Sequence, residues 1–587
     1  MIRLATVFSG IGAIEHALDR MQLEHEIVFA CDNGDVELDI KTTEDELDTM
    51  NVSLTFLTNE IDNMRATATG TNADYAEQLE RMLQGAQNAM QELETMLIPA
   101  KNLIVENIDI NSVFVAIKDI VGKKLEVCSS SKRKKYKELL QGFRINTLSD
   151  NAKRYLIIKA ILTLREDKIS IDNEDIFNFE LTIASNIKKI VKQGKDIKER
   201  INMLYDKIFY FETSNALSKL PSYADRKKYV DGLYKGKEKR NKVKESYLAN
   251  YKLDPEHFHW NVAFLDGAQY FGKVDLFVGG SPCQSFSLVG KQRGLEDTRG
   301  TLFYEYARLV KEVQPKIFIY ENVKAILSND DGKTWEKMKE VFASLGYKVF
   351  YTMNGKASVL NAKDYGIPQN RERMFVVGFR SDLILEKDFE FPTPVKLKRK
   401  MKDYLLDSVS GAYYLPKKGV DFVTSEKNLT KKYTQIDGDI ALCQKKNQQF
   451  NWHGDFVFVE ENKDMEKTME ELEKYFLSEK VEKYVLATGT GNFYSRPKTD
   501  LDVARPLLTT MHKMHRAGVD NYVHTNGRLR KLTPRECLRL MGFCDSFKIV
   551  VSDTSMYQQA GNSIVVDVLI HILKQIFESY PAFGKEK

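Results

Sequence analysis

One cysteine occupies a turn that could expose a nucleophile to a ligand. Cys283 lies within the run GGSPCQSFS, which follows a short apolar segment at residues 274–278. The apolar segment predicts a buried strand, and the glycines and proline predict a sharp turn where that strand ends. Such a turn places the thiol at the carboxyl edge of a sheet, where open α/β folds bind ligands. A buried structural cysteine is the usual alternative, but this turn offers no core for a side chain to pack into.

A glycine loop near the amino terminus has the form of a cofactor site. An apolar segment that predicts a strand precedes Gly10, and a segment of helical periodicity follows Gly12. Asp32, 20 positions after Gly12, could accept hydrogen bonds from ribose hydroxyls. Glu15 stands where a dinucleotide fingerprint has its third glycine, which favours a nucleoside-type cofactor over NAD. For the two glycines taken alone, an ordinary turn is the alternative.

The composition is that of a globular protein with more than one domain. The chain has 587 residues, of which 43% are hydrophobic and 29% charged, and this length exceeds one ordinary core. A net charge of +4 does not by itself indicate a nucleic-acid partner. The six cysteines form no CxxC pair, so we expect free thiols in a reducing compartment and no metal site. No apolar run approaches the roughly 18 residues of a membrane span, so no membrane partner is expected.

Strands and helices alternate in two parts of the chain that a long segment separates. The alternation occupies residues 1–36 and resumes over 243–391, and it predicts a mostly parallel α/β sheet with helices on both faces. Residues 37–242 interrupt it and form a predicted insert. Residues 392–525 are irregular and predict a smaller separate domain, after which 526–587 return to helices of the sheet domain.

The insert has the periodicity of helices. Two apolar stripes with spacings of 3 and 4 predict an antiparallel coiled-coil hairpin that turns at residues 66–74. Stripes of this kind are more often packing surfaces than binding sites. Two basic runs, at 132–137 and 226–240, are ordinarily solvated faces, and contact with phosphates is the alternative.

Seven short motifs occur in the order that characterises one enzyme family. They are 8–12 (FSGIG), 282–284 (PCQ), 297–303 (DTRGTLF), 321–323 (ENV), 369–373 (QNRER), 535–543 (RECLRLMGF) and 561–563 (GNS). The chain therefore resembles the DNA cytosine-C5 methyltransferase family over residues 1–36 and about 243–580. The resemblance implies a Rossmann-like, S-adenosylmethionine-dependent methyltransferase sheet. It also implies methyl transfer to carbon 5 of a cytosine that is flipped out of duplex DNA.

The resemblance gives four residues catalytic roles that fit the chemistry of cytosine. Carbon 5 is a poor nucleophile, and a thiolate that adds to carbon 6 makes it reactive toward a sulfonium methyl group. Cys283 would be this thiolate, and Glu321 would protonate or hydrogen-bond the ring nitrogen N3. Arg371 and Arg373 would bind the cytosine O2 and stabilise its developing charge. An ion pair with a helix or a phosphate is the alternative for both arginines.

S-adenosylmethionine is the cofactor that the resemblance implies. Asp32 would bind its ribose and Asp266 its adenine amino group, and helix-capping or loop positions are the alternative for both carboxylates. The full set of implied cofactor residues is Phe8, Ser9, Gly10, Ile11, Gly12, Asp32, Asp266, Gly267, Pro282, Leu302, Asn562 and Ser563.

Double-stranded DNA is the implied substrate. The irregular residues 392–525 occupy the position of the family's target-recognition domain, and the run RPLLTT at 505–510 is similar to its closing element. Bases or phosphates are expected to meet Gln284, Ser285, Thr509, Thr510, Lys513 and Arg516. A plain surface loop is the alternative for these positions, and no target sequence follows from them.

The insert is the chief departure from the family. Asp32 and Asp266 are 234 positions apart, whereas one strand–helix unit needs roughly 30 residues. We expect the insert to add DNA contacts, to recruit a partner or to join two copies of the chain. Asn33 and Gly34 follow Asp32 where the family often carries a bulky residue against adenine, so that contact is not predicted.

Three functions remain open at this point. The first is a sequence-specific DNA methyltransferase of a bacterium or phage, acting in the cytoplasm either alone or with a cognate restriction endonuclease. The second is the same chemistry on structured RNA such as tRNA, and the third is a catalytically silent DNA-binding or assembly protein. The variable region favours DNA, and the set of Cys283, Glu321 and Arg373 argues against a silent protein. Amino-group methyltransferases are disfavoured, because they carry an Asp/Asn-Pro-Pro-Tyr-type site where Pro-Cys-Gln stands here.

Overall fold

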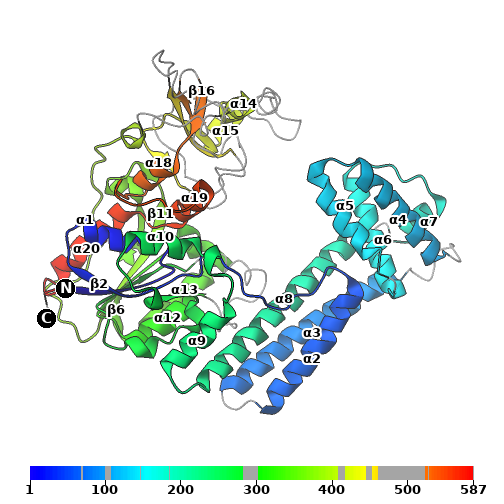
Figure 1. The fold of residues 1–587 in the computed structure, drawn as a ribbon, viewed down its shortest axis with the longest axis horizontal. Coiled ribbons are helices and arrows are strands. Elements are labelled where there is room, and N and C mark those ends of the chain that lie inside the picture. The colour runs from blue at the N-terminus through cyan, green and yellow to red at the C-terminus, as the bar shows by residue number, and fades with distance from the viewer. Residues whose placement is uncertain are drawn as a thin grey trace. The chain divides into compact units, whose positions relative to one another are not determined.

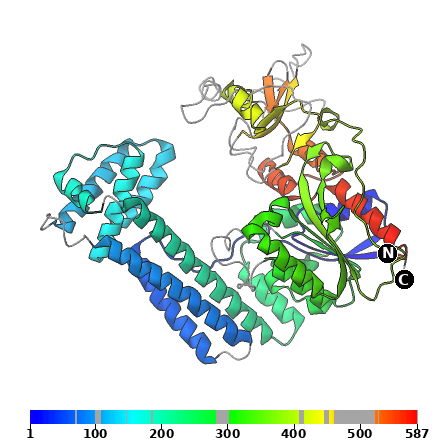
Figure 2. The same ribbon diagram turned by 180° about the vertical axis from the view of Figure 1, so that it is seen from behind.

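The computed structural model describes most of the chain in two compact units. In order along the chain it describes residues 1–67, 71–98, 108–145, 147–183, 186–281, 302–406, 415, 417–444, 452–459, 522–525 and 528–585. One unit joins Met1–Leu38 to Leu220–Lys587, and the other is Asp39–Lys219. The first is a sheet flanked by helices and the second is built of helices (Figure 1), and Figure 2 shows each from behind.

An eight-stranded sheet forms the centre of the first unit. Its strands are β1 (Ile2–Val7), β2 (His25–Cys31), β3 (Phe258–His259), β4 (Leu276–Gly279), β5 (Ile317–Val323), β6 (Tyr347–Phe350), β9 (Val359–Asn361) and β11 (Glu372–Arg380). The order is β3-β2-β1-β4-β5-β11-β6, with β9 paired to β11. The neighbouring strands β3, β2, β1, β4 and β5 are parallel to one another, and β11 is antiparallel to β5 and β6. The amino-terminal strands β1 and β2 thus complete a sheet whose other strands come from beyond residue 220.

Two hydrophobic cores cover the two faces of this sheet. Leu4 of β1 packs into one core and Ala5 into the other, as the alternation of a strand requires. The first core includes α1 (Ala13–Arg20), α10 (Lys242–Asn250), α18 (Pro534–Arg539), α19 (Asp553–Asn562) and α20 (Val566–Ser579). The second includes α12 (Leu302–Val313) and α13 (Lys333–Ala343). The predicted α/β fold with helices on both faces is confirmed.

One stretch of the sheet unit resembles a membrane span by length and hydropathy. This stretch is Asp553–Ser579, which contains α19 and α20, and it is the one such stretch among the described residues. Leu569 and Leu573 of α20 are fully buried in the first core. The apolar side of this stretch therefore serves the interior of the sheet unit.

The second unit is helical throughout its described part. Its helices are α2 (Leu47–Thr67), α3 (Thr71–Leu97), α4 (Ile110–Val127), α5 (Ser130–Gly142), α6 (Asp150–Glu166), α7 (Glu174–Ile183) and α8 (Ile187–Ser218). Helices α2 and α3 lie side by side as a hairpin, and the apolar stripes pack between them and their neighbours, with Met82 of the second stripe only partly buried. The 32-residue α8 packs along both helices. The hairpin is therefore part of a three-helix arrangement, which the sequence did not predict.

The compact helical unit ends earlier than the predicted boundary at residue 242. Residues from 220 onward, including α9 (Tyr223–Leu233), pack with the sheet unit. The Tyr223 hydroxyl lies 2.9 Å from that of Tyr270, and the Tyr234 ring stacks on Trp260 with 4.5 Å between centroids. These aromatic contacts attach the returning chain beside the end of β3.

The region expected to be a separate domain at 392–525 has a small sheet of its own. Its described elements are α14 (Lys417–Val423), α15 (Glu426–Thr430), β12 (Thr434–Ile436), β14 (Gly454–Val459), β15 (Tyr522–Thr525) and β16 (Arg528–Lys531). The strands lie in the order β12-β14-β15-β16. A separate core of Leu415, Val423, Ile436, Trp452 and Phe456 supports them. We call residues 417–531 the recognition region.

Candidate active site

The strand that leads to Cys283 runs beside the strand that carries Glu321. Strand β4 pairs with β5 so that Gly279 lies opposite Tyr320. A Cβ atom on Gly280 would lie 2.7 Å from Glu321 Oε2 and 2.8 Å from Glu321 O, so only glycine fits this approach. Residues 282–301, with Cys283, lie outside the described residues. Ser281, two positions before Cys283, is described.

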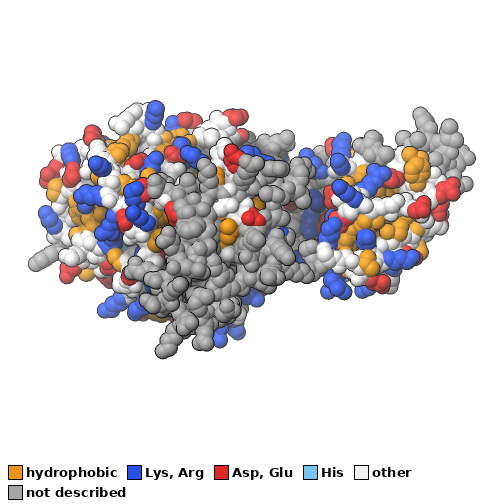
Figure 3. Space-filling view, turned by 90° about the horizontal axis from the view of Figure 1, so that it is seen from above, with side chains coloured by type: hydrophobic (Ala, Val, Ile, Leu, Met, Phe, Trp, Pro, Cys, Tyr) orange, Lys and Arg blue, Asp and Glu red, His pale blue; other side chains and the backbone are white. Residues whose placement is uncertain are grey.

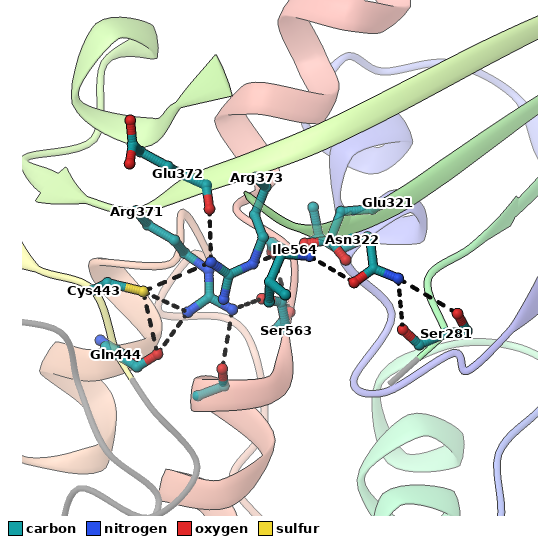
Figure 4. A network of polar contacts seen from close by, with 12 residues as sticks. Ser281, Glu321, Asn322, Arg371, Glu372, Arg373, Cys443, Gln444, Ser563 and Ile564 are labelled. Atoms are coloured by element: carbon teal, nitrogen blue, oxygen red, sulfur yellow. Dashed lines mark hydrogen bonds and ion pairs between the residues drawn. The ribbon is translucent and has the colours of Figure 1, made fainter. Parts of the chain in front are cut away.

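A buried network fastens Ser281 to β5 (Figure 4). Asn322 Nδ2 donates to Ser281 O at 3.2 Å and to Tyr320 OH at 2.8 Å, and Ser281 Oγ lies 2.6 Å from Tyr320 OH. All three side chains are buried, where polar groups need partners and water does not compete. The residue after Glu321 thus anchors the backbone that precedes Cys283.

Glu321 and Arg373 form an ion pair next to this network. Arg373 Nε lies 3.0 Å from Glu321 Oε1, and the two side chains are 16% and 13% exposed. Strand β11 is antiparallel to β5, with Arg373 opposite Val323 and Phe375 opposite Glu321. The structure therefore brings together two of the four residues expected to be catalytic, on neighbouring strands.

The surroundings of Glu321 favour its protonated form. Burial raises the pKa of the Glu321 carboxyl, and the positive charges of Arg373 and Arg371 oppose that shift. A carboxyl with a raised pKa keeps its proton closer to neutral pH, and it can then donate that proton to a ring nitrogen. The geometry and the pKa therefore both suit Glu321 to the role of a general acid.

Arg371 is placed differently from Arg373. It is 3% exposed, and its guanidinium donates to three backbone carbonyls: Gln444 O at 2.8 Å, Gly561 O at 3.0 Å and Ser563 O at 2.8 Å. Burial and the neighbouring charge of Arg373 lower the pKa of Arg371 to about 10. These contacts do not support the expectation that Arg371 binds the cytosine O2.

Cys443 is a residue of this site that sequence reasoning missed. Its Sγ lies 3.9 Å from Arg371 NH1 and 3.8 Å from Arg373 NH1, and Figure 4 shows the thiol beside both guanidiniums. Strand β13 (Ala441–Leu442) pairs with β10 (Gln369–Asn370) and brings the thiol there. No motif marks Cys443, because its place depends on the pairing of two strands of two residues each.

The cofactor loop is held in an unusual backbone conformation. Phe8, Gly10 and Gly12 have φ angles of 53°, 54° and 76°. The Tyr251 ring fills the space where a Cβ atom on Gly12 would lie, and its hydroxyl donates to Gly12 O at 2.8 Å. A larger residue at Gly12 would meet both a clash and a strained φ. Tyr251 is thus a positioning residue that no sequence motif indicated.

Asp32 caps the cofactor loop from β2. Its carboxylate accepts from Gly10 N at 2.9 Å and from Gly34 N at 2.8 Å. The side chain is half-buried at the carboxyl end of the strand. Each carboxylate oxygen has more than one acceptor site, so these bonds leave room for ribose hydroxyls. The structure brings Asp32 and the predicted glycine loop together.

Glu15, which replaces the third glycine of a dinucleotide fingerprint, is fully buried beneath the loop. Its Oε1 accepts from Thr6 Oγ1 at 3.1 Å and from Tyr247 OH at 2.5 Å. Burial raises the pKa of this carboxyl, and the two hydrogen bonds oppose the shift in part. Glu15 therefore supports the loop from below.

Asp266 and Gly267 lie in the connection between β3 and β4. Strand β3 ends at His259, and 262–264 form a 3₁₀ turn, whereas the apolar run 262–265 before Asp266 predicts a strand. Gly267 N donates to Glu312 Oε2 of α12 at 2.9 Å. Asp266 forms an ion pair with Arg226 at 2.7 Å. Adenine binding by Asp266 therefore stays a prediction.

The remaining predicted residues divide between described and undescribed parts of the chain. Leu302 begins α12 and packs, like Phe8, on the second core, whereas Asn562 is exposed and Ser563 is buried at the end of α19. The following lie outside the described residues: Cys283, Pro282, Gln284, Ser285, Thr509, Thr510, Lys513 and Arg516.

Each of the two basic runs contains one or more lysines that form ion pairs within the protein. Lys132 and Lys135 bond to Asp167 and Glu166, and in the second run Lys227 bonds to two carboxylates. Figure 3 shows Lys and Arg side chains beside Asp and Glu on the described surface of each unit. Among the described residues no group of three or more His, Cys, Asp or Glu could bind a metal ion.

Comparison with known proteins gives a consistent result. Residues 226–578 match the model of a family described as C-5 cytosine-specific DNA methylase. The type II methyltransferase M.HhaI of Haemophilus parahaemolyticus is 35% identical over 306 residues, which cover 52% of this chain and 76% of the relative. The orphan methyltransferase M.SPRI of Bacillus phage SPR is 28% identical, over 57% of this chain and 90% of the relative. Among solved structures, S. pombe Dnmt2 methyltransferase is 18% identical with a TM-score of 0.36, over 57% of this chain and 88% of that one.

Proposed function

Because the chain belongs to the C-5 cytosine-specific DNA methylase family, we propose that it methylates carbon 5 of cytosines at a specific sequence in duplex DNA. Members of this family take the methyl group from S-adenosylmethionine. The observation that carries the proposal is the Glu321–Arg373 ion pair, which is 3.0 Å long. Glu321 lies on β5, next to the strand that leads to Cys283, and Arg373 lies on β11, next to β5. The resemblance assigns these residue types to cytosine chemistry.

The proposed reaction begins with the thiolate of Cys283. The thiolate adds to carbon 6 of the flipped cytosine, and the electron pair of the C5–C6 double bond moves toward N3 and O2. Glu321 donates its proton to N3, and Arg373 stabilises the charge on O2. Carbon 5 then takes a methyl group from the sulfonium donor, whose sulfur becomes a neutral thioether. A general base removes the proton of carbon 5, N3 returns its proton to Glu321, and the thiolate leaves as the C5–C6 double bond re-forms. Each of these residues acts directly on the cytosine, and no step requires a metal ion.

The described loop at 8–12 fits the proposed cofactor. S-adenosylmethionine supplies an electrophilic methyl group on a sulfonium when it is bound. Positive φ angles at Gly10 and Gly12 let a ligand approach the backbone closely. The Asp32 carboxylate lies over the same loop and could accept from the ribose hydroxyls. Pro282, Leu302, Asn562 and Ser563 would complete the pocket, and Asp266 would bind the adenine amino group.

We propose that the recognition region selects the target sequence. Along the chain, this region lies between β11, which carries Arg373, and the carboxyl-terminal helices. Its small sheet has a separate core. Thr509, Thr510, Lys513 and Arg516 remain proposed DNA contacts. Since relatives include a type II and an orphan phage methyltransferase, the enzyme would serve a DNA modification system, with or without a cognate restriction endonuclease. A contribution of the helical unit to DNA or partner binding is also a proposal.

Transfer of labelled methyl groups tests the proposal directly. Mixed-sequence duplex DNA and tRNA are each incubated with the protein and methyl-labelled S-adenosylmethionine, with Cys283→Ala as the control. We expect label in DNA that disappears with Cys283→Ala, and 5-methylcytosine at one sequence on mapping. Label only in tRNA would replace the DNA assignment, and label that survives Cys283→Ala would exclude the covalent mechanism.

A further inference from the structure

We propose that Arg371 is a positioning residue. It links residues 561–563, which belong to the proposed cofactor site, to the segment at 441–444 that enters the recognition region. Through this link, binding of the cofactor and binding of DNA would strengthen each other. The inference rests on the proposed function, because it takes 561–563 as part of the cofactor site and 417–531 as the DNA-recognition region. It concerns how the two sites communicate and leaves the chemistry at Cys283 unchanged.

The guanidinium of Arg371 is fully engaged at its outer end. NH1 donates to Gln444 O and approaches Cys443 Sγ, while NH2 donates to Gly561 O and Ser563 O. These contacts use the four N–H groups that a base or phosphate would otherwise meet. Its Nε has no hydrogen-bond partner and is buried. Arg371 is therefore built to join backbone segments rather than to bind a substrate.

The three carbonyls come from two segments that Arg371 joins. Gly561 and Ser563 end α19, and Gln444 follows β13 some 117 positions earlier in the chain than Gly561 (561 − 444). A planar guanidinium fixes the relative positions of its acceptors, whereas a lysine would bond them singly. A shift of the 561–563 loop therefore has to move Gln444 or break a buried hydrogen bond.

The segment at 441–444 continues the connection into the recognition region. Leu442 N donates to Asp455 Oδ2 at 2.7 Å, and Asp455 is a fully buried residue of β14. Gln435 Nε2 next to it donates to Asp455 Oδ1 at 2.8 Å. Polar contacts thus run from Ser563 through Arg371 and residues 442–444 to the recognition sheet. Spatial continuity alone does not establish coupling, so the test measures a coupling factor.

Gln369 strengthens the same junction from the strand that precedes Arg371. Its Oε1 accepts from Gln444 N at 3.1 Å, and its Nε2 donates to Leu540 O at 2.7 Å. The segment at 441–444 is consequently held at two points against the carboxyl-terminal part of the sheet unit. Because the segment at 441–444 is held rigidly, a displacement of residues 561–563 should be passed on to the recognition region.

The decisive measurement is the DNA dissociation constant with and without S-adenosylhomocysteine, a product that cannot transfer a methyl group. The mapped target duplex carries a fluorophore, and anisotropy gives both constants. In the unaltered protein we expect the product to tighten DNA binding by about 5–150-fold, the usual range of such coupling. In Arg371→Lys we expect that factor to fall to about 1–2, because lysine keeps the charge but not the three-way connection.

Arg539→Lys is the matched control. Arg539 also joins backbone segments of the sheet unit, with bonds to Leu405 O at 2.8 Å and to the Asp545 carboxylate. It should lower the melting temperature without changing the coupling factor. Calorimetric titration with S-adenosylhomocysteine, together with the methyl-transfer assay, shows separately whether the cofactor site and the proposed function survive in each variant.

Three results would overturn the inference. They are an unaltered protein without coupling, an Arg371→Lys variant that keeps the full factor, and a variant whose DNA affinity falls equally with and without product. The last would make Arg371 a substrate ligand. If Arg371→Lys does not fold, hydrogen exchange on the unaltered protein decides. S-adenosylhomocysteine without DNA should slow exchange in peptides covering 441–444, and unchanged exchange there would refute the link.

Discussion

Replacement of Gly280 by alanine should damage catalysis through the carboxyl group of Glu321. The new Cβ atom would lie 2.7 Å from Glu321 Oε2 and 2.8 Å from Glu321 O. One of these contacts is with backbone in the middle of the sheet, so a side-chain rotation alone cannot relieve it. Overpacking of this kind costs about 1–3 kcal/mol. If the displaced carboxyl bears this cost in the transition state, kcat should fall by about 5–150-fold.

Gly279→Ala separates strain from catalysis. Its Cβ atom would lie 2.7 Å from Val7 Cγ2 and 2.8 Å from Val7 O, which is equal crowding without contact to Glu321. Both variants should therefore melt at similarly lowered temperatures. Steady-state methyl transfer should show the fall in kcat for Gly280→Ala, and chiefly a raised KM for S-adenosylmethionine for Gly279→Ala, since Val7 precedes the cofactor loop. Equal kcat values in the two variants would refute the assignment of Glu321 to the chemical step.

Three further predictions concern groups near the two sites. Glu15→Gln should make the free energy of unfolding less dependent on pH. Burial raises the pKa of Glu15 in the folded state, so the unaltered protein loses stability as the pH rises from the unfolded-state pKa of ~4.3 through the folded-state pKa. Melting temperatures across pH would show this, and parallel curves for both proteins would contradict it. Arg373→Gln should lower kcat by about 10²–10³-fold and move the alkaline limb of the pH–rate profile upward, because the charge of Arg373 lowers the pKa of Glu321; a downward shift would be incompatible. Tyr251→Phe removes the bond to Gly12 O, at about 1 kcal/mol, so KM for S-adenosylmethionine should rise about fivefold with kcat unchanged; an unaltered KM would show that the loop does not need this bond.

The sheet could be predicted because its strands are apolar and end in distinctive motifs. Strands β1, β4 and β5 each precede a polar or glycine-rich turn, and parallel strands bring such turns to one edge. The heptad stripes of α2 and α3 likewise follow from local spacing. All six residues of the first stripe are buried: Leu47, Met50, Leu54, Leu57, Ile61 and Met64. In these elements the local pattern and the tertiary structure agree, which is where sequence reasoning is strongest.

The strand expected at 262–265 and the role expected of Arg371 both depend on contacts that local pattern does not contain. The apolar residues 262–265 suggested a strand that ends at Asp266, since short apolar runs do not distinguish a strand from a turn. Arg308 of α12 instead donates to Val262 O at 2.7 Å and to Leu265 O at 3.0 Å, and these bonds replace a strand's partners. Arg371 is a similar case, because a motif shows an arginine but not whether its acceptors are carbonyls or a base.

The junction of the helical insert explains how so long an insertion is compatible with the cofactor site. Asn241, which begins α10 after the insert, donates to Asp32 O at 2.9 Å and lies so close to Gly34 that a Cβ atom there would clash. Lys237 Nζ donates to Glu37 O at 2.8 Å. The departing and returning chains are thus bonded to each other within the sheet unit. Because the entropy of closing a loop grows only with the logarithm of its length, these bonds can hold Asp32 in place whatever the size of the insert.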